Sequence, residues 1–99
     1  MAAATRIGDA DVTHCSGMSR EEGSENVFVN SIAWSCQGHL NTPHLKPQPP
    51  PPPCIIHTAP IASGSSTVYV NSVGAGRIGD GISGCTSVAE GSENVFAGG

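Results

Sequence analysis

The chain has little of what most folded domains use to build a core. Of its 99 residues only two are leucine, and Leu, Ile, Val and Phe together number 19. A low content of large apolar residues can indicate disorder. However, charged residues make up only 12% and the net charge is −4, which fits the highly charged disordered class poorly. The 13 glycines, together with Val, Ile and Thr, indicate instead a β protein with many tight turns. A domain this small often needs a metal, a disulfide or a partner to supplement its core.

Several functional classes are excluded by what the sequence does not contain. Four scattered Lys and Arg residues cannot form a basic groove for nucleic acid. No apolar run approaches the ~20 residues of a membrane-spanning helix. The N-terminus, MAAATRIGDAD, has neither the charged nor the apolar region of a secretory signal. We therefore expect synthesis in a reducing cytosol, where the four cysteines are metal ligands or free thiols rather than two disulfides.

Two phrases near the N-terminus recur near the C-terminus. RIGD and EGSENVF occur first at residues 6–9 and 22–28 and again at 77–80 and 90–96. A weaker middle copy opens with AWSCQGH, which matches AGRIGDG of the last copy, and closes with ASGSSTVYVNS. Internal repetition determines architecture. We predict one domain, residues 1–99, with three repeats and a proline-rich loop, at about 6–31, 33–72, 76–99 and 46–54.

Each repeat closes on a segment that alternates in polarity, namely NVFVN, TVYVN and NVFAG at residues 26–30, 67–71 and 94–98. A period of two is typical of a β-strand, and the Gly-Ser and Asn-Ser pairs around these segments are typical of tight turns. No window shows a helical period. We predict an all-β fold of short strands and tight turns with little or no helix. Three copies of one β unit indicate pseudo-three-fold symmetry, and a small solenoid or a β-sandwich is the alternative. Candidates for core or partner contacts are Val27, Val29, Val68, Val70 and Val95.

Loop residues at corresponding positions of the repeats can bind metal. His14 and Cys85 each lie five residues after the aspartate of RIGD, and the middle repeat carries His39 and His57 in its loops. Three repeats related by a pseudo-three-fold axis would bring these loops together at one point. The resulting His₃Cys set suits tetrahedral Zn²⁺ with no open position, although iron or nickel also accept such ligands. A structural metal would supply stability that a thin core lacks.

Alternatives remain for two of these ligands. His44 can replace His39, and Cys15 can replace His14, its neighbour in sequence. Cys36 and Cys54 are interpreted as free thiols. The run PQPPPPP at residues 47–53 is predicted to be polyproline II and is interpreted as an exposed loop.

The sequence offers no candidates for catalysis. Asp9 and Asp80 belong to the repeated turns, where a carboxylate is expected to bond backbone or arginine. No nucleophile elbow is present, and RIGDGISG lacks the Lys-Ser/Thr of a phosphate-binding loop. We therefore assign no catalytic residue and no small-molecule substrate, and we do not expect an enzyme.

The motifs taken in order resemble a known family. A-x-R-I-G-D, then a His or Cys five residues later, then E-G-S-x-N-V-F-V-N is similar to the PAAR-repeat family over essentially the whole chain, although the middle repeat has WSCQG in place of RIGD. Members of this family form the tip of contractile injection machines, both type VI secretion spikes and the central spikes of contractile phage tails. The resemblance implies a cone of β-hairpins and a metal, usually zinc, near its vertex. The implied ligands are His14, His39, His57 and Cys85.

The resemblance also implies partners and a location. We expect one tip to cap each trimeric β-helical spike and to touch the target cell envelope transiently during piercing; the sequence does not identify the residues that bind the spike. Many secretion-system relatives carry a toxin domain after the repeats, and this sequence ends at EGSENVFAGG. We therefore expect a structural protein of a phage tail baseplate, made in the bacterial cytoplasm and carried in the virion. The alternatives are a type VI secretion tip without a fused effector and, in a different class, a small secreted disulfide-stabilised binding module.

Overall fold

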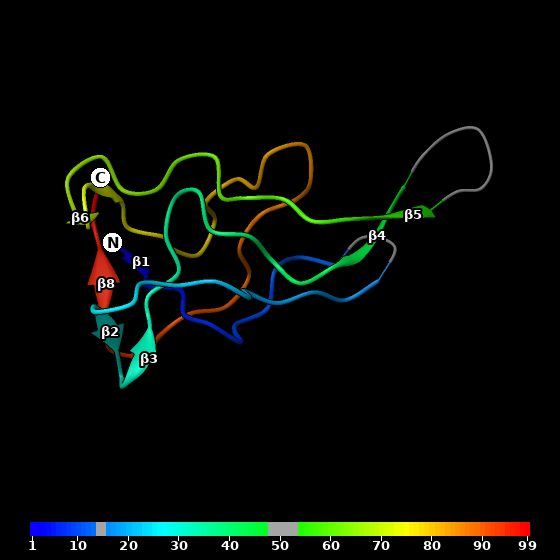
Figure 1. Ribbon diagram of the computed structural model, residues 1–99. Coiled ribbons are helices and arrows are strands. Elements are labelled where there is room, and N and C mark those ends of the chain that lie inside the picture. The colour runs from blue at the N-terminus through cyan, green and yellow to red at the C-terminus, as the bar shows by residue number, and fades with distance from the viewer. Residues whose placement is uncertain (14–15, 48–53) are drawn as a thin grey trace.

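The computed structural model describes residues 1–13, 16–47 and 54–99. Regular structure in these residues consists of short antiparallel strand pairs linked by isolated bridges (Figure 1). The predicted all-β fold is therefore confirmed. The described residues contain no helix that is long and apolar enough to cross a membrane.

The strands pair in a simple topology. In the described part of the chain the pairs are β2 (Phe28–Val29) with β3 (Ile32–Ala33), β6 (Tyr69–Val70) with β7 (Val73–Gly74), β8 (Phe96–Ala97) with β1 (Ala2–Ala3), and β4 (His44–Pro47) with β5 (Cys54–His57). In three of the pairs each strand is only two residues long, as expected for short strands between tight turns.

Two of these pairs are hairpins closed by identical Asn-Ser turns. Asn30 and Ser31 join β2 to β3, Asn71 and Ser72 join β6 to β7, and all four have φ between 52° and 72°. Positive φ at both central positions is the type I′ geometry, whose twist suits a two-residue hairpin, and asparagine tolerates it better than most residues. The third pair brings together β8 and β1, from opposite ends of the sequence, in the corresponding register.

A buried serine organises the turn before β2, β6 and β8. The hydroxyls of Ser24, Ser65 and Ser92 each accept the backbone N–H groups of the residues two and three positions later, at 2.8–3.2 Å. The glycines before Ser65 and Ser92 are needed for close approach, because a Cβ on Gly64 or Gly91 would lie 2.4 Å or 2.6 Å from a backbone oxygen; a Cβ on Gly23 would lie 3.0 Å from the Cβ of Ala33. The Gly-Ser phrase therefore recurs because the same compact turn is built three times.

The core consists of two small apolar clusters. The larger comprises Ala4, Val29, Trp34, Cys36, Val70, Ala75 and Ala97. Four further valines pack against it while only partly buried, namely Val27, Val68, Val73 and Val95. The smaller cluster comprises Ala59, Ile61, Ile82 and Val88, and Cys85 packs against it. Most of these side chains are small, so the core is as thin as the composition predicts.

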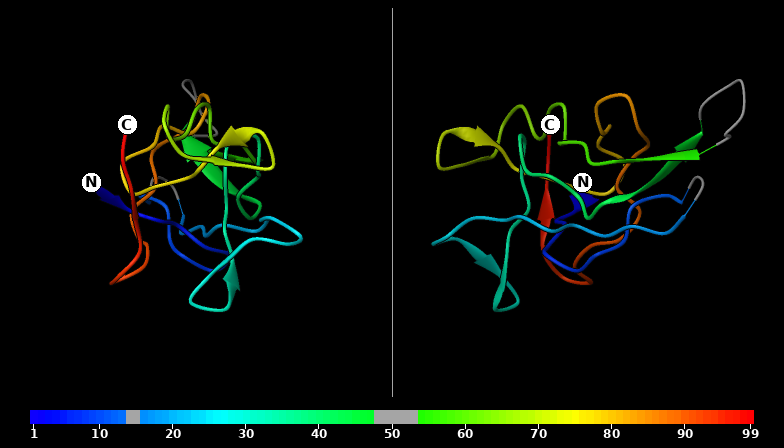
Figure 2. Two further views of the ribbon diagram at one scale, coloured as in Figure 1. Left: turned by 90° about the vertical axis from the view of Figure 1, so that its left-hand side faces the viewer. Right: turned by 45° about the vertical axis from the view of Figure 1, so that its right-hand side comes forward.

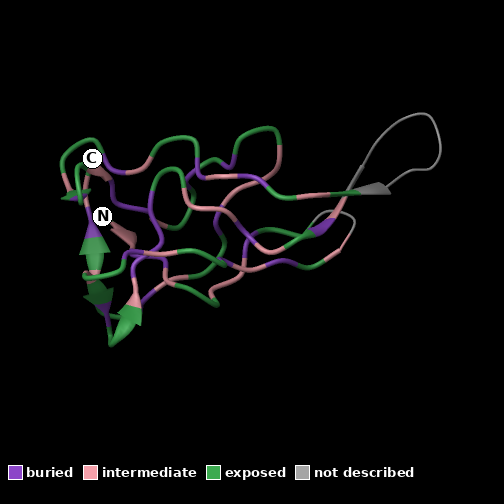
Figure 3. Cartoon of the chain, in the orientation of Figure 1, coloured by how far each residue is buried: buried purple, intermediate pink, exposed green. Residues whose placement is uncertain are grey.

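The molecule is elongated, with extents of 40 × 23 × 21 Å. The pairs β1/β8, β2/β3 and β6/β7 gather at one end, which we call the base, and surround the long axis in the end-on view (Figure 2). The pair β4/β5 lies at the opposite end, which we call the vertex (Figure 1). Buried residues run through the middle of the molecule, while the strands of the base carry exposed residues (Figure 3).

Candidate metal centre

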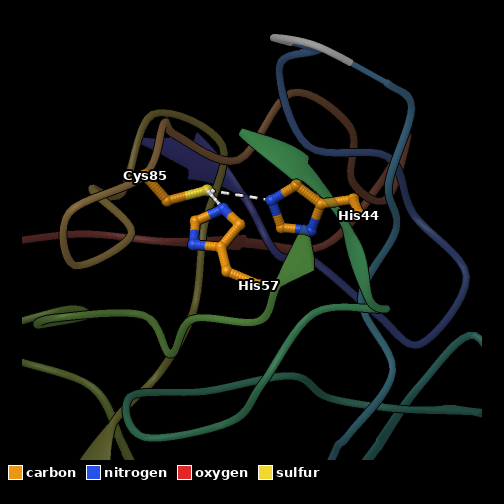
Figure 4. Close-up of side chains that lie close together, drawn as sticks. All are labelled: His44, His57 and Cys85. Atoms are coloured by element: carbon orange, nitrogen blue, oxygen red, sulfur yellow. Dashed lines mark hydrogen bonds between the residues drawn. The ribbon is translucent and has the colours of Figure 1, made fainter. Parts of the chain in front are cut away.

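At the vertex, two strands and one turn bring together three side chains of types that can bind a metal ion. His44 begins β4, His57 ends β5, and the antiparallel register pairs them directly. Residues opposite each other project from the same face, and the ring centroids lie 4.3 Å apart. Cys85 comes from a turn in which its N–H donates to the Ile82 carbonyl at 3.0 Å, and its sulfur points at both rings (Figure 4).

The spacing of the three side chains suits a tetrahedral metal ion. The Cys85 Sγ lies 3.3 Å from His44 Nε2 and 3.5 Å from His57 Nε2. Metal bonds of about 2.3 Å to sulfur and 2.05 Å to nitrogen, at the tetrahedral angle, place nitrogen and sulfur about 3.5 Å apart. One ligand atom from each residue lies within 4.8 Å of the others. His44, His57 and Cys85 are thus positioned to bind a metal ion, and imidazole and thiolate are the donors that zinc accepts.

The surroundings of His44 orient its ring for coordination. Its Nδ1 lies 2.8 Å from the carbonyl oxygen of Thr42. Because a carbonyl can only accept, Nδ1 carries the proton and donates, and Nε2 keeps its lone pair toward Cys85. The residue is only 3% exposed. The fold therefore selects the tautomer that metal binding requires.

Burial makes the Cys85 thiol harder to ionise. Burial raises the pKa of this thiol, and the opposing hydrogen bond from Asn41 does not bring the pKa back to its ordinary value. A metal ion bound by Cys85 would favour the thiolate, because a coordinating thiol is deprotonated outright. Metal binding at this site would therefore release a proton and weaken as the pH falls.

His39 lies outside this cluster because it closes a turn in the middle repeat. Its Nδ1 accepts the backbone N–H of Cys36 at 2.8 Å. The carboxylates of Asp9 and Asp80 accept the corresponding N–H, three residues earlier, at 2.9 Å and 2.8 Å. All three turns contain a glycine with φ near +90°, namely Gly8, Gly38 and Gly79. Residues 36–39 therefore replace RIGD, with an imidazole accepting the bond that a carboxylate accepts elsewhere.

This geometry corrects the alignment of the middle repeat by one residue. Matching AWSCQGH to AGRIGDG pairs His39 with a glycine, whereas the hydrogen bonds pair it with Asp80. Five residues after His39 comes His44, just as Cys85 comes five residues after Asp80. The spacing rule used on the sequence thus points to His44 once the register is right. The position of Gly38 was the available signal.

Other residues from the sequence analysis are only partly accounted for. His14 and its alternative Cys15 lie outside the described residues, as does the proline run from 48 to 53. Cys36 forms no disulfide and is fully buried in the larger core cluster, where burial raises the pKa of its thiol. The fourth ligand therefore stays a prediction.

Two open grooves, each of about 580 Å³, lie on the flanks of the molecule. One is lined by Arg6, Asp9, Asn30, Ile78, Glu90, Gly91, Glu93 and Asn94, and the other by Glu22, Gly23, Ser24, Glu25, Asn26, His39 and Asn71. These sets occupy corresponding positions in successive repeats, so the grooves are a consequence of the symmetry. Neither contains a residue of the metal cluster.

Comparison with known families agrees with this architecture. The family model described as the PAAR motif matches residues 8–83, well over half of the chain. The matched span includes the turn at His39 together with His44 and His57. A comparison with curated protein sequences gives no match.

Proposed function

The chain belongs to the PAAR-motif family, the spike-tip proteins of contractile injection systems, and we propose that it caps the blunt end of a trimeric β-helical spike. In this role one chain gives the spike a narrow point for piercing a cell envelope. The family is structural rather than enzymatic, and no reaction is proposed for this chain. The proposed setting is the tail baseplate of a contractile phage, and a type VI secretion spike is the alternative.

The observation that carries this proposal is a set of three exposed aromatic side chains on the base. Phe28, Tyr69 and Phe96 are 57%, 62% and 48% exposed, and they occupy corresponding positions of β2, β6 and β8. Each is followed by a buried residue that packs into the larger core cluster. Large apolar groups gathered at one end of a small protein mark a contact surface.

A trimeric partner suits this surface because the base offers similar contacts three times. A homotrimer presents three identical surfaces around its axis. One chain with three repeats can meet all three at once, through one strand pair each. Short strand pairs also leave backbone N–H and C=O groups at their edges, which can extend the sheet of a partner. The proposed stoichiometry is therefore one tip for three spike chains.

The metal cluster lies at the other end, where a piercing tip needs rigidity without a large core. We propose that the ion is zinc, with iron as the alternative, and that His44, His57 and Cys85 hold it. We propose His14 as the fourth ligand, because it follows Asp9 by the spacing that separates His44 from His39. The ion would cross-link segments that are distant in sequence, which reduces the conformational freedom of the vertex.

The docking proposal is tested by native mass spectrometry with a trimeric β-helical spike protein from the same genome. We expect a complex of one tip and three spike chains. The triple variant Phe28→Ala, Tyr69→Ala, Phe96→Ala should weaken binding by at least an order of magnitude. Ile56→Ala removes a 72% exposed apolar side chain at the vertex and should leave binding unchanged. Equal binding by both variants would refute the base as the docking face.

The setting is tested separately. Mass spectrometry of purified phage particles should detect the chain if it is a tail-tip protein. Its appearance only in culture medium, dependent on a secretion apparatus, would replace the phage proposal with the secretion alternative.

A further inference from the structure

Beside His44, His57 and Cys85 lies a buried set of polar side chains, Asp11, Arg20 and Asn41, that the fold itself does not require. Arg20 Nη2 donates to Asp11 Oδ2 at 3.0 Å, and neither side chain has any exposed surface. Asn41, also fully buried, donates to the same oxygen at 3.2 Å. In the other repeats the position of Arg20 carries Ile61 and Val88, and the position of Asp11 carries Ile82 and Asn41 itself; the three aliphatic residues belong to an apolar cluster.

Stability alone explains this polar group poorly. Burial lowers the pKa of the Arg20 guanidinium and raises the pKa of the Asp11 carboxyl, so each charge is held against a desolvation cost. Within the described part of the chain, Asp11 Oδ1 and Arg20 Nε have no hydrogen-bond partner. Apolar residues in place of a buried ion pair are often equally stable or more so. The aliphatic side chains of the other repeats show that this fold accepts them.

Asn41 connects the ion pair to the metal cluster. Its Oδ1 accepts the N–H of Ala59 at 3.0 Å while its Nδ2 donates to Asp11, so the orientation of the amide is determined. The same nitrogen lies 3.4 Å from Met18 Sδ and 4.0 Å from Cys85 Sγ. Since one N–H is directed to Asp11, the other is left for the two sulfur atoms.

We propose that Asn41 is a positioning residue of the metal site, which donates an N–H to the Cys85 thiolate and is itself held by Asp11 and Arg20. A metal-bound thiolate is a stronger acceptor than a thiol, so loading strengthens this contact. The charges of Asp11 and Arg20 act on the pKa of Cys85 in opposite directions, whereas the Asn41 amide and the backbone N–H of Thr86 both donate toward its sulfur, and Asn41 is the side-chain donor of the two. Groups that hydrogen-bond to metal ligands typically change metal affinity by about 10–100-fold. The inference rests on the proposed metal site but not on the proposed spike partner.

Cobalt(II) is the probe, because its thiolate charge-transfer absorption reports on the sulfur directly. Asn41→Leu removes the donor, so the energy of the sulfur lone pair rises and the band should move to lower energy. A competing chelator should remove cobalt at least about 10-fold faster than from the wild type. Val29→Ala is the matched control, because it truncates a core residue of the base, 2% exposed, and should lower the melting temperature without changing band or removal rate.

An Asn41→Leu protein that melts earlier but keeps the wild-type band and removal rate would overturn the inference and leave Asn41 a structural residue. If this variant does not fold, NMR of the ¹⁵N-labelled wild type decides. One side-chain amide proton of Asn41 should shift on zinc binding while those of Asn71, at the base, do not. The absence of that shift would also overturn the inference. A wild-type protein that binds no cobalt and no zinc would refute the metal site itself, so the two failures are distinguishable.

Discussion

Replacing His39 by alanine should weaken the fold without removing the metal. The imidazole accepts one backbone N–H, from Cys36 at 2.8 Å, and the side chain is half-buried. Leaving a donor without its acceptor costs about 1–3 kcal/mol when the group is buried. For a domain of this size each kcal/mol lowers the melting temperature by roughly 4–8 °C. We therefore expect a fall of roughly 5–20 °C with full metal content.

Replacing His39 by aspartate is the matched control, because aspartate is what the other repeats use. Asp9 and Asp80 accept the corresponding N–H groups at 2.9 Å and 2.8 Å. A carboxylate at position 39 can therefore close the same turn. We expect the His39→Asp protein to melt within a few degrees of the wild type and to retain one metal ion per chain.

Replacing His44 by alanine should remove the metal, in contrast to replacing His39. The residue offers Nε2 to the metal cluster, 3.3 Å from Cys85 Sγ. Structural zinc in small domains contributes apparent binding energies of about 10–16 kcal/mol, so a lost ligand should reduce metal content sharply. The melting temperature should then approach that of the chelator-treated wild type.

Metal content by elemental analysis after gel filtration, together with melting curves followed by the fluorescence of buried Trp34, distinguishes the three variants. A His39→Asp protein without metal, beside a His44→Ala protein that keeps it, would refute the assignment of His44. The ligand would then be His39, and the turn at residues 36–39 would have to open.

Two further predictions concern buried groups. Asp11→Ile leaves Arg20 buried without its partner and should lower the free energy of unfolding by about 3–5 kcal/mol. Adding Arg20→Val should recover most of this loss, because no buried charge then remains. Denaturant unfolding measures both variants, and a double variant as unstable as the single one would contradict the reasoning. Because burial raises the pKa of the Cys36 thiol, the unfolded chain loses this proton first as the pH rises above about 8.5. The unfolded state then binds fewer protons than the folded state, so stability should decline with increasing pH. Cys36→Ala should flatten the decline in melting temperature between about pH 8 and 10 relative to the wild type, and equal slopes would exclude Cys36 as its source.

The sequence alone determined the repeated architecture, because the chemistry that builds it is local. A serine that caps its own turn, as Ser24, Ser65 and Ser92 do, needs only the residues that follow it. The Asn-Ser turns depend in the same way on residues that tolerate positive φ. The all-β fold followed from these patterns and from the resemblance they carry, and so did the expectation that His57 and Cys85 lie close together.

Only the tertiary structure decided which histidine of the middle repeat faces Cys85. His39 and His44 are both loop histidines in sequence, and the local signal that separates them, Gly38, can be interpreted only once the register of the middle repeat is known. The choice depends on contacts with distant segments: the Gly38 N–H donates to the carbonyl of Ile61, and His57 pairs with His44 across β4 and β5. The buried ion pair of Asp11 and Arg20 was hidden for the same reason. Charged residues normally lie at the surface, and only packing against other repeats removes these two from water.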